Sequence, residues 1–410
     1  MNLQKTYGIL LVTLLMGMVF APTSFAESNS EQTMIKSDGI NICFVSVEDY
    51  SSKTYEEKMY LVRFCKDPDE YPPIGIHILK KKDIEPKKFY VLLPGTGLNS
   101  TTNFYINENK SMAEFLADKD ILVIGIDYRE NNIDSADYHF MAKMGLSQHT
   151  DDLDQIVKLV QKRTHISKYS VVGHSLGGLI GLDYASKNSD DINLMGLYVM
   201  DIAGTLNASE EQELVQSQRV NYYATVTMIK SGQTVNFEML GLAILAFNAR
   251  TNPDGDSGVE NPYVPGPNLT NYEYFLVATI YTGQMPGNEI FVQGFFAGNL
   301  SMGLNNTPME TVYSIASQGK IYPLKINKDI FGIFAGVPGS YQIKWNNIKV
   351  PVQWKNFELG IGVRGKEAAN LIKQGGNQNV NFSIVGGYGH ADGVYSLRAE
   401  QDVWKPFFED

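Results

Sequence analysis

The segment best suited to covalent chemistry is a serine set among glycines, Gly173-His-Ser-Leu-Gly-Gly178. Residues 169–172 before it have the β-branched and aromatic character of a buried strand, and residues 179–185 after it favour a helix. A strand that turns straight into a helix strains the turn residue, Ser175, and only small neighbours permit this. This nucleophile elbow predicts that Ser175 is the nucleophile and that the Leu176 N–H stabilises a developing oxyanion. The alternative is a structural turn, because such a pentapeptide also arises by chance in a chain with 37 glycines.

A second oxyanion donor is expected in the loop after another buried strand. The buried strand predicted from Lys88 onward ends in Leu93-Pro-Gly-Thr96, a turn flanked by glycine. A loop at the carboxyl end of a sheet strand can direct a backbone N–H toward the nucleophile. We therefore predict the Thr96 N–H as the second donor of the oxyanion hole.

Only one histidine is placed to act as the base. Where a serine elbow of this kind is used, the acid and then the histidine follow the serine along the chain. Of six histidines, His174 lies within the elbow and His390 alone follows it. His390 lies in a glycine-rich loop after the last predicted strand, which predicts that it accepts the proton of the nucleophile. We expect His174 to be a packing residue and Asp392 to brace the loop around His390.

The elements that position these residues alternate between strand and helix. Further buried strands are predicted at residues 121–127, 194–200, 348–354 and 380–385, and an antiparallel meander at 42–47, 59–64 and 74–79. The alternation lapses over residues 205–345, which predicts an inserted cap or lid. Residues 27–204 and 346–410 then form one α/β core.

The composition and the amino-terminal residues bear on partners and compartment. A net charge of −11 and a pI near 5.1, with no visible basic patch, argue against nucleic acid as a partner. Residues 1–26 carry Lys5, an apolar stretch and Ser24-Phe-Ala26, the pattern of a cleaved signal peptide. We therefore expect a secreted or periplasmic protein that begins near Glu27, the alternative being an uncleaved anchor.

The chain has two cysteines, Cys43 and Cys65, both near the amino terminus. In an exported protein this predicts a disulfide between them, and the alternative is two buried thiols. Two isolated cysteines do not make a zinc site, and residues 252–258 lack the turn glycine and closing carboxylate of a calcium loop. We expect neither a metal nor a cofactor.

Three of these motifs resemble those of the α/β-hydrolase family. Gly173-His-Ser-Leu-Gly-Gly178 is similar to the lipase and esterase elbow, Leu93-Pro-Gly-Thr96 to the oxyanion loop, and Gly389-His-Ala-Asp392 to the His-x-Asp ending of several lipase branches. The resemblance covers residues 75–204 and 346–410. It implies the α/β-hydrolase fold, a mostly parallel, doubly wound sheet, here with an inserted cap.

The acid of the triad has two candidates. The resemblance implies an acid after the strand that precedes the histidine strand, where Glu358 is the first carboxylate. The chain departs from the family there, since Trp354-Lys-Asn-Phe-Glu-Leu-Gly360 stands where Gly-x-x-Asp is usual. Asp201, at the end of the strand after the elbow helix, is the alternative because some lipases place their acid there. Glu358 is the favoured prediction.

Together these features predict an exported serine hydrolase that cleaves carboxylic esters, of the lipase or esterase kind, through an acyl-enzyme. The expected partners are small-molecule or lipid ester substrates, with transient contact to a membrane or lipid surface. The same residues also serve peptidases, amidases and acyltransferases. A non-catalytic binding protein that keeps the fold is a further alternative.

Overall fold

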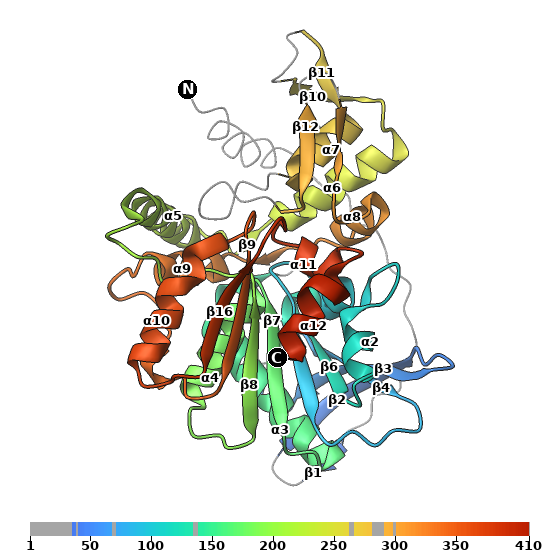
Figure 1. Ribbon diagram of the computed structural model, residues 1–410, viewed down its shortest axis with the longest axis vertical. Helices are drawn as coiled ribbons and strands as arrows, with labels where there is room; N and C mark the ends of the chain where they lie inside the picture. Colours follow the sequence, from blue (N-terminus) through green and yellow to red (C-terminus); the bar gives the residue numbers. More distant parts are fainter. Residues whose placement is uncertain are drawn as a thin grey trace.

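The computed structural model describes residues 35–37, 40–67, 71–133, 138–261, 266–280, 291–297 and 301–409. The predicted signal peptide, residues 1–26, lies outside this part of the chain. A ten-stranded sheet forms the centre of the molecule, in the order β1-β2-β3-β4-β6-β5-β7-β8-β15-β16 (Figure 1). Its strands are β1 (Ile35–Ser37), β2 (Ile40–Asp49), β3 (Tyr55–Phe64), β4 (Ile74–Lys81), β5 (Phe89–Leu93), β6 (Leu122–Asp127), β7 (Tyr169–His174), β8 (Leu194–Met200), β15 (Val352–Phe357) and β16 (Val380–Val385).

The sheet is parallel from β6 to β16 and antiparallel from β1 to β4. Every residue of β5, β6 and β7 is buried, as expected for parallel strands covered on both faces. The predicted meander and the mostly parallel core are therefore confirmed. β15 begins at Val352 and not at residue 348, since Pro351 has no N–H to contribute to the ladder.

Helices cover both faces of the sheet. One apolar core packs α3 (Leu146–Thr164), α4 (Leu176–Lys187) and α10 (Lys366–Gln374) against one face. A second core packs α2 (Met112–Ala117), α11 (Asp392–Tyr395) and α12 (Lys405–Phe408) against the other. The amphipathic pattern explains α3, because its buried residues recur at helical spacing on one side. This is the doubly wound α/β arrangement.

The interval between β8 and β15 holds further helices and short strands, some of which pack on the two apolar cores. In Figure 1 most of them rise above the upper end of the sheet. They are α5 (Gln212–Lys230), β9 (Val235–Asn236), α6 (Glu238–Thr251), β10 (Asp256–Glu260), β11 (Asn268–Thr270), α7 (Asn271–Ile280), β12 (Gly294–Ala297), β13 (Ser301–Leu304), α8 (Met309–Ala316), β14 (Tyr322–Pro323) and α9 (Leu324–Phe334). They occupy the interval that the sequence assigned to an inserted cap.

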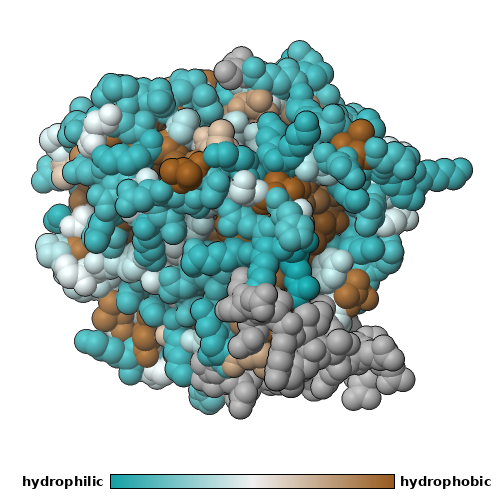
Figure 2. Space-filling model, turned by 90° about the horizontal axis from the view of Figure 1, so that it is seen from below, coloured by the Kyte–Doolittle hydropathy of each residue, from teal (hydrophilic) through white to brown (hydrophobic). Residues whose placement is uncertain are grey.

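Two further features bear on compartment and surface. A disulfide joins Cys43 on β2 to Cys65 just after β3, with 4.9 Å between their Cα atoms, as predicted. Within the described ranges, we find no helix with the length and apolar character needed to span a bilayer. The face seen in Figure 2 is largely hydrophilic, and its hydrophobic residues lie in separate patches.

Candidate active site

The serine lies at a sharp turn between β7 and α4. Ser175 has φ 54° and ψ −122°, a left-handed conformation that a residue with a side chain rarely adopts. A Cβ added to Gly177 would lie 2.0 Å from the Leu93 carbonyl oxygen, and one added to Gly173 would lie 2.3 Å from the Gly177 backbone. Backbone contacts within the turn require glycine at position 173, and the close approach of β5 requires it at position 177. The local geometry is that of a nucleophile elbow.

The loop that carries Thr96 packs directly on this elbow. It follows β5, and a Cβ added to Gly95 would lie 3.4 Å from the Ser175 Cβ. The Gly95 N–H donates to the Asn103 side chain at 2.7 Å, so this amide is already occupied. Thr96, the next residue, and Leu176, the first residue of α4, are the predicted oxyanion donors and follow the ends of neighbouring strands.

A buried carboxylate pairs with His390. His390 Nδ1 lies 2.6 Å from Asp201 Oδ2, and the side chains of the two residues are 4% and 0% exposed. Asp201 directly follows β8 and has a positive φ of 45°. The structure thus gives His390 the alternative acid, Asp201, and the preference for Glu358 as its partner is corrected. A carboxylate accepts hydrogen bonds, so Nδ1–H is the donor and Nε2 keeps its lone pair.

The turn after β15 holds the acid in place instead of supplying it. Asp201 Oδ1 accepts the Phe357 N–H at 2.6 Å, and the Ile361 N–H lies 3.1 Å from Oδ2. A Cβ added to Gly360 would lie 2.2 Å from Asp201 Oδ2, so only glycine leaves room for the carboxylate. These donors stabilise the charged form in a buried site.

Glu358 faces the solvent side of the same turn. Phe357, the last residue of β15, is buried, whereas Glu358, in the turn that follows, is exposed. Glu358 Oε2 accepts the Gly387 N–H at 2.8 Å, an exposed bond to the loop that carries His390. The Glu358 side chain thus contacts the backbone of this loop and not the imidazole of His390, which pairs with Asp201.

His174 is buried as predicted, yet it does more than pack. Its Nε2 lies 3.0 Å from the His390 carbonyl oxygen, and its ring lies 4.8 Å from the His390 ring, centroid to centroid. Burial, with a smaller effect of His390, lowers the pKa of His174 to about 3, so the ring is neutral. His174 precedes Ser175 in the chain, and it therefore fixes the base loop beside the nucleophile.

The prediction that Asp392 braces the loop of His390 is confirmed. Its Oδ2 accepts the Gly389 N–H at 2.8 Å, and burial raises the pKa of its carboxyl. The same carboxylate accepts the Gln293 N–H at 2.8 Å and the Thr307 hydroxyl at 2.6 Å, both from the interval between β8 and β15. Asp392 therefore also ties the inserted segment to the base loop.

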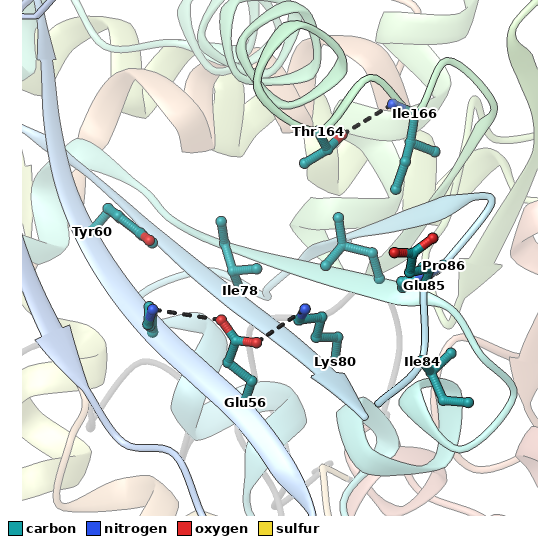
Figure 3. Close-up of a pocket in the computed structure, with 11 residues that line it drawn as sticks. Glu56, Tyr60, Ile78, Lys80, Ile84, Glu85, Pro86, Thr164 and Ile166 are labelled. Atoms are coloured by element: carbon teal, nitrogen blue, oxygen red, sulfur yellow. Dashed lines mark hydrogen bonds and ion pairs between the residues drawn. The ribbon is translucent and has the colours of Figure 1, made fainter. Parts of the chain in front are cut away.

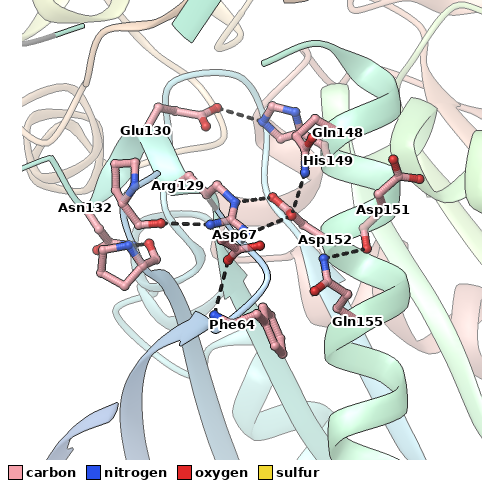
Figure 4. A network of polar contacts seen from close by, with 12 residues as sticks. Phe64, Asp67, Arg129, Glu130, Asn132, Gln148, His149, Asp151, Asp152 and Gln155 are labelled. Carbon is pink, nitrogen blue, oxygen red and sulfur yellow. Dashed lines mark hydrogen bonds and ion pairs between the residues drawn. The ribbon is translucent and has the colours of Figure 1, made fainter. Parts of the chain in front are cut away.

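A fully buried arginine follows β6 and was not singled out by the sequence. Arg129 donates to Asp152 Oδ2 at 2.8 Å and to Asp67 Oδ2 at 2.9 Å, which joins α3 to the turn after β3 (Figure 4). Beside it, His149 Nε2 lies 3.0 Å from Glu130 Oε1. This network has the character of a structural ion cluster, because Arg129 bonds two carboxylates and His149 pairs with a third.

A cavity of about 450 Å³ lies far from these residues along the sheet. It is bounded by β3, β4, Ile84 and Ile166, and an ion pair of 3.0 Å between Lys80 and Glu56 lies along it (Figure 3). Leu122 and Ile166 stand at or before the amino ends of β6 and β7, whereas Ser175 follows the carboxyl end of β7. The cavity therefore plays no part in the site around Ser175.

Several known proteins are similar to this chain in sequence or in fold. Residues 85–200 match the family model described as serine aminopeptidase, S33. A candidate lipase from Sulfolobus solfataricus shares 17% identity over 92% of this chain and 98% of its own, with a TM-score of 0.62. Esterase E22 (13% identity, 86% and 99% covered) and the epoxide hydrolase VrEH1 from Vigna radiata (14%, 82% and 93%) each reach a TM-score of 0.46. No curated protein matches the sequence.

The matched residues include β5, the Ser175 elbow and β8, and the fold is shared with the Sulfolobus protein. The chain therefore has the α/β-hydrolase fold, and over residues 85–200 it is similar to the family described as serine aminopeptidase, S33.

Proposed function

We propose that the protein is a serine hydrolase that cleaves carboxylic esters through an acyl-enzyme. The observation that carries the proposal is the pair of His390 and Asp201, 2.6 Å apart and buried, beside a strained Ser175 elbow. Two rare features lie at the same end of the sheet. One is a serine with a positive φ, and the other is a buried imidazole whose Nδ1 pairs with a carboxylate. Both belong to the chemistry of an activated serine.

The reaction follows from the protons these residues hold. Ser175 Oγ attacks the ester carbonyl carbon while its proton passes to His390 Nε2, and Asp201 stabilises the resulting imidazolium. The oxygen of the tetrahedral intermediate accepts the Leu176 and Thr96 N–H groups. The intermediate collapses, the alkoxide leaves with the proton of His390, and the acyl group remains on Ser175. Water, deprotonated by His390, then attacks the acyl carbon, and the carboxylic acid product leaves as Ser175 Oγ takes back the proton.

Hydrolysis of a short p-nitrophenyl ester by the purified protein tests this proposal. Ser175→Ala should abolish turnover and keep the thermal midpoint of unfolding. Ser186→Ala is the matched control, since its hydroxyl also lies on α4 but donates to the Asp183 carbonyl at 2.8 Å, away from the site. Wild-type protein without esterase activity, or Ser175→Ala protein with near wild-type turnover, contradicts the proposal.

For the substrate we propose esters of lipid-like acyl chains that enter under the segment at residues 205–345. This segment exposes large apolar side chains, among them Phe247 on α6 and Tyr223 on α5, which are 65% and 59% exposed. Such side chains suit contact with acyl chains or a lipid surface. The ratio kcat/KM should rise from acetyl to octanoyl esters, and a flat or falling series contradicts this substrate class.

A peptidase or amidase is the second candidate, because the matching family model is described as a serine aminopeptidase. The same serine, base and oxyanion donors would attack an amide. Parallel assays with an aminoacyl p-nitroanilide and the corresponding p-nitrophenyl ester separate the two. Faster turnover of the anilide would move the assignment to peptidase.

We also propose that the protein is exported. The signal-like pattern of residues 1–26 supports this, as does a disulfide, which persists mainly in oxidising compartments. Amino-terminal sequencing of the protein recovered from its native compartment should begin near Glu27. Recovery of the uncleaved chain in the cytosol contradicts export.

A further inference from the structure

The peptide bond between Pro94 and Gly95 is held at both of its polar atoms. The Tyr128 hydroxyl donates to the Pro94 carbonyl oxygen at 2.9 Å. On the other side, the Gly95 N–H donates to Asn103 Oδ1 at 2.7 Å. Both contacts are buried, so water does not compete for them. The orientation of this peptide plane is therefore fixed by two side chains.

Both clamping side chains are themselves firmly placed. Asn103 is 0% exposed and lies in η2 (Thr101–Tyr105), a π-helical turn whose start is held by the Ser100 N–H on Asp127 Oδ1 at 2.7 Å. Tyr128 directly follows β6, and its ring packs edge-on against His149 at 4.8 Å. Burial raises the pKa of Tyr128 well above its usual range, so the phenol remains a hydrogen-bond donor.

The clamp also reaches the base. His174 Nε2–H donates to the His390 carbonyl oxygen at 3.0 Å, so Nδ1 of this neutral ring carries a lone pair. Asn103 Oδ1 lies 3.3 Å from Nδ1 and also accepts, so these two atoms are in contact without a hydrogen bond. Asn103 and His174 thus pack together between the oxyanion loop and the base loop.

We propose that Asn103 and Tyr128 are positioning residues that clamp the Pro94–Gly95 peptide and thereby aim the Thr96 N–H at the oxyanion. The inference rests on the proposed esterase function. Thr96 is one residue beyond the clamped plane, so a rotation of that plane moves its N–H directly. A donor that is misplaced by about 1 Å costs up to roughly 100-fold in rate.

The test uses two variants that remove one side of the clamp each. Tyr128→Phe deletes only the hydroxyl, and Asn103→Leu keeps the side-chain volume but loses the acceptor. We expect kcat for a short p-nitrophenyl ester to fall by about 10- to 100-fold in each, with KM within about twofold, because the donor acts mainly in the transition state. Affinity for an alkyl boronic acid, which forms a tetrahedral adduct with the serine, should fall in parallel with kcat/KM.

Thr102→Val is the matched control, since it lies in the same π-helical turn but its hydroxyl donates to Gln318 Oε1 at 2.9 Å. It should keep kcat within about twofold, as usual for a substitution away from the reacting groups. Active-site titration with a fluorophosphonate corrects each rate for the folded fraction. Tyr128→Phe needs no new packing, so it tests the clamp even if Asn103→Leu fails to fold.

The outcomes separate this inference from the proposed function. Tyr128→Phe with unchanged kcat, or losses in KM alone, overturns the clamp while the esterase remains. Equal losses in Thr102→Val would also overturn it, because any change in the turn would then suffice. Wild-type protein that neither hydrolyses esters nor reacts with fluorophosphonate removes the proposed function itself.

Discussion

Replacement of Asp201 by asparagine should remove most activity by changing the tautomer of His390. The Phe357 N–H lies 2.6 Å from Asp201 Oδ1, which only an acceptor can satisfy, so the asparagine carbonyl must stay there. Its NH₂ group then occupies the place of Oδ2, where His390 Nδ1 lies 2.6 Å away. An NH₂ group donates, so the imidazole proton moves to Nε2. His390 can then no longer accept the proton of Ser175.

The expected loss in kcat is roughly 10³- to 10⁴-fold, the size seen when a triad aspartate of a serine protease becomes asparagine. The variant keeps the Phe357 bond and loses the acceptor at Oδ2, but the Ile361 N–H also lies 3.2 Å from Oδ1 and can use the asparagine carbonyl. The thermal midpoint should therefore fall by only a few degrees. Initial rates on a short p-nitrophenyl ester at neutral pH measure the effect. Ser175→Ala protein prepared in parallel gives the background from contaminating esterases.

Glu358→Gln is the control that distinguishes the two acids. Its carboxylate is exposed and accepts only the Gly387 N–H at 2.8 Å among the contacts described, and a glutamine carbonyl can accept the same bond. We expect kcat within about twofold of wild type, as for other exposed substitutions. Full activity in Asp201→Asn together with a large loss in Glu358→Gln would refute the reasoning from His390 geometry.

Three further predictions concern the surroundings of the site and the stability of the fold. Gly360→Ala places a Cβ 2.2 Å from Asp201 Oδ2 and should therefore displace this carboxylate. We expect kcat to fall by about 10- to 100-fold in the same ester assay. A wild-type rate would show that the turn adapts to the added Cβ. Cys43→Ser opens a disulfide loop with a sequence separation of 22 and should lower the free energy of unfolding by about 3 kcal/mol in urea titrations; an unchanged value would show that the bond is not formed. Burial lowers the pKa of His149, but the Glu130 carboxylate outweighs it and raises this pKa from 6.5 to about 8. The pair should therefore add roughly 2 kcal/mol to the free energy of unfolding. This stabilisation is fully present below pH 6.5 and is lost as the pH rises through 8. Unfolding at a series of pH values measures the loss, and Glu130→Gln should abolish this part of the pH dependence.

Local pattern was sufficient for the parts of the site that depend on neighbouring residues. The elbow could be predicted because a buried strand, a serine between glycines and a small-residue helix are contiguous in sequence. The disulfide could be predicted because only two cysteines exist. The position of His390 followed from chain order, since no other histidine comes after Ser175.

The acid could not be settled in this way because β8 and β15 are neighbours that end at the same edge of the sheet. A carboxylate after either strand can come near the base, and the choice depends on which side each residue faces. Asp201 turns inward with a positive φ, whereas Glu358 follows the buried Phe357 and faces out. Neither direction is visible in composition or spacing.

Asn103 and His174 were missed as positioning residues for a related reason. The contact of His174 with His390 joins residues that are 216 positions apart, and an isolated asparagine such as Asn103 carries no sequence pattern. The one sequence signal for a positioning role was the place of Asn103, a few residues after the oxyanion loop. A π-helical turn has no periodic signature that would indicate where its side chains point.

Identification of the residue that reacts with a fluorophosphonate probe tests the central claim most directly. The purified wild-type protein is treated with the probe, digested, and examined by mass spectrometry. We predict a single adduct on Ser175, complete loss of labelling in Ser175→Ala, and normal labelling in Ser186→Ala. Protein that stays unlabelled, or an adduct on any other residue, would contradict the assignment of Ser175 as the nucleophile of a serine hydrolase.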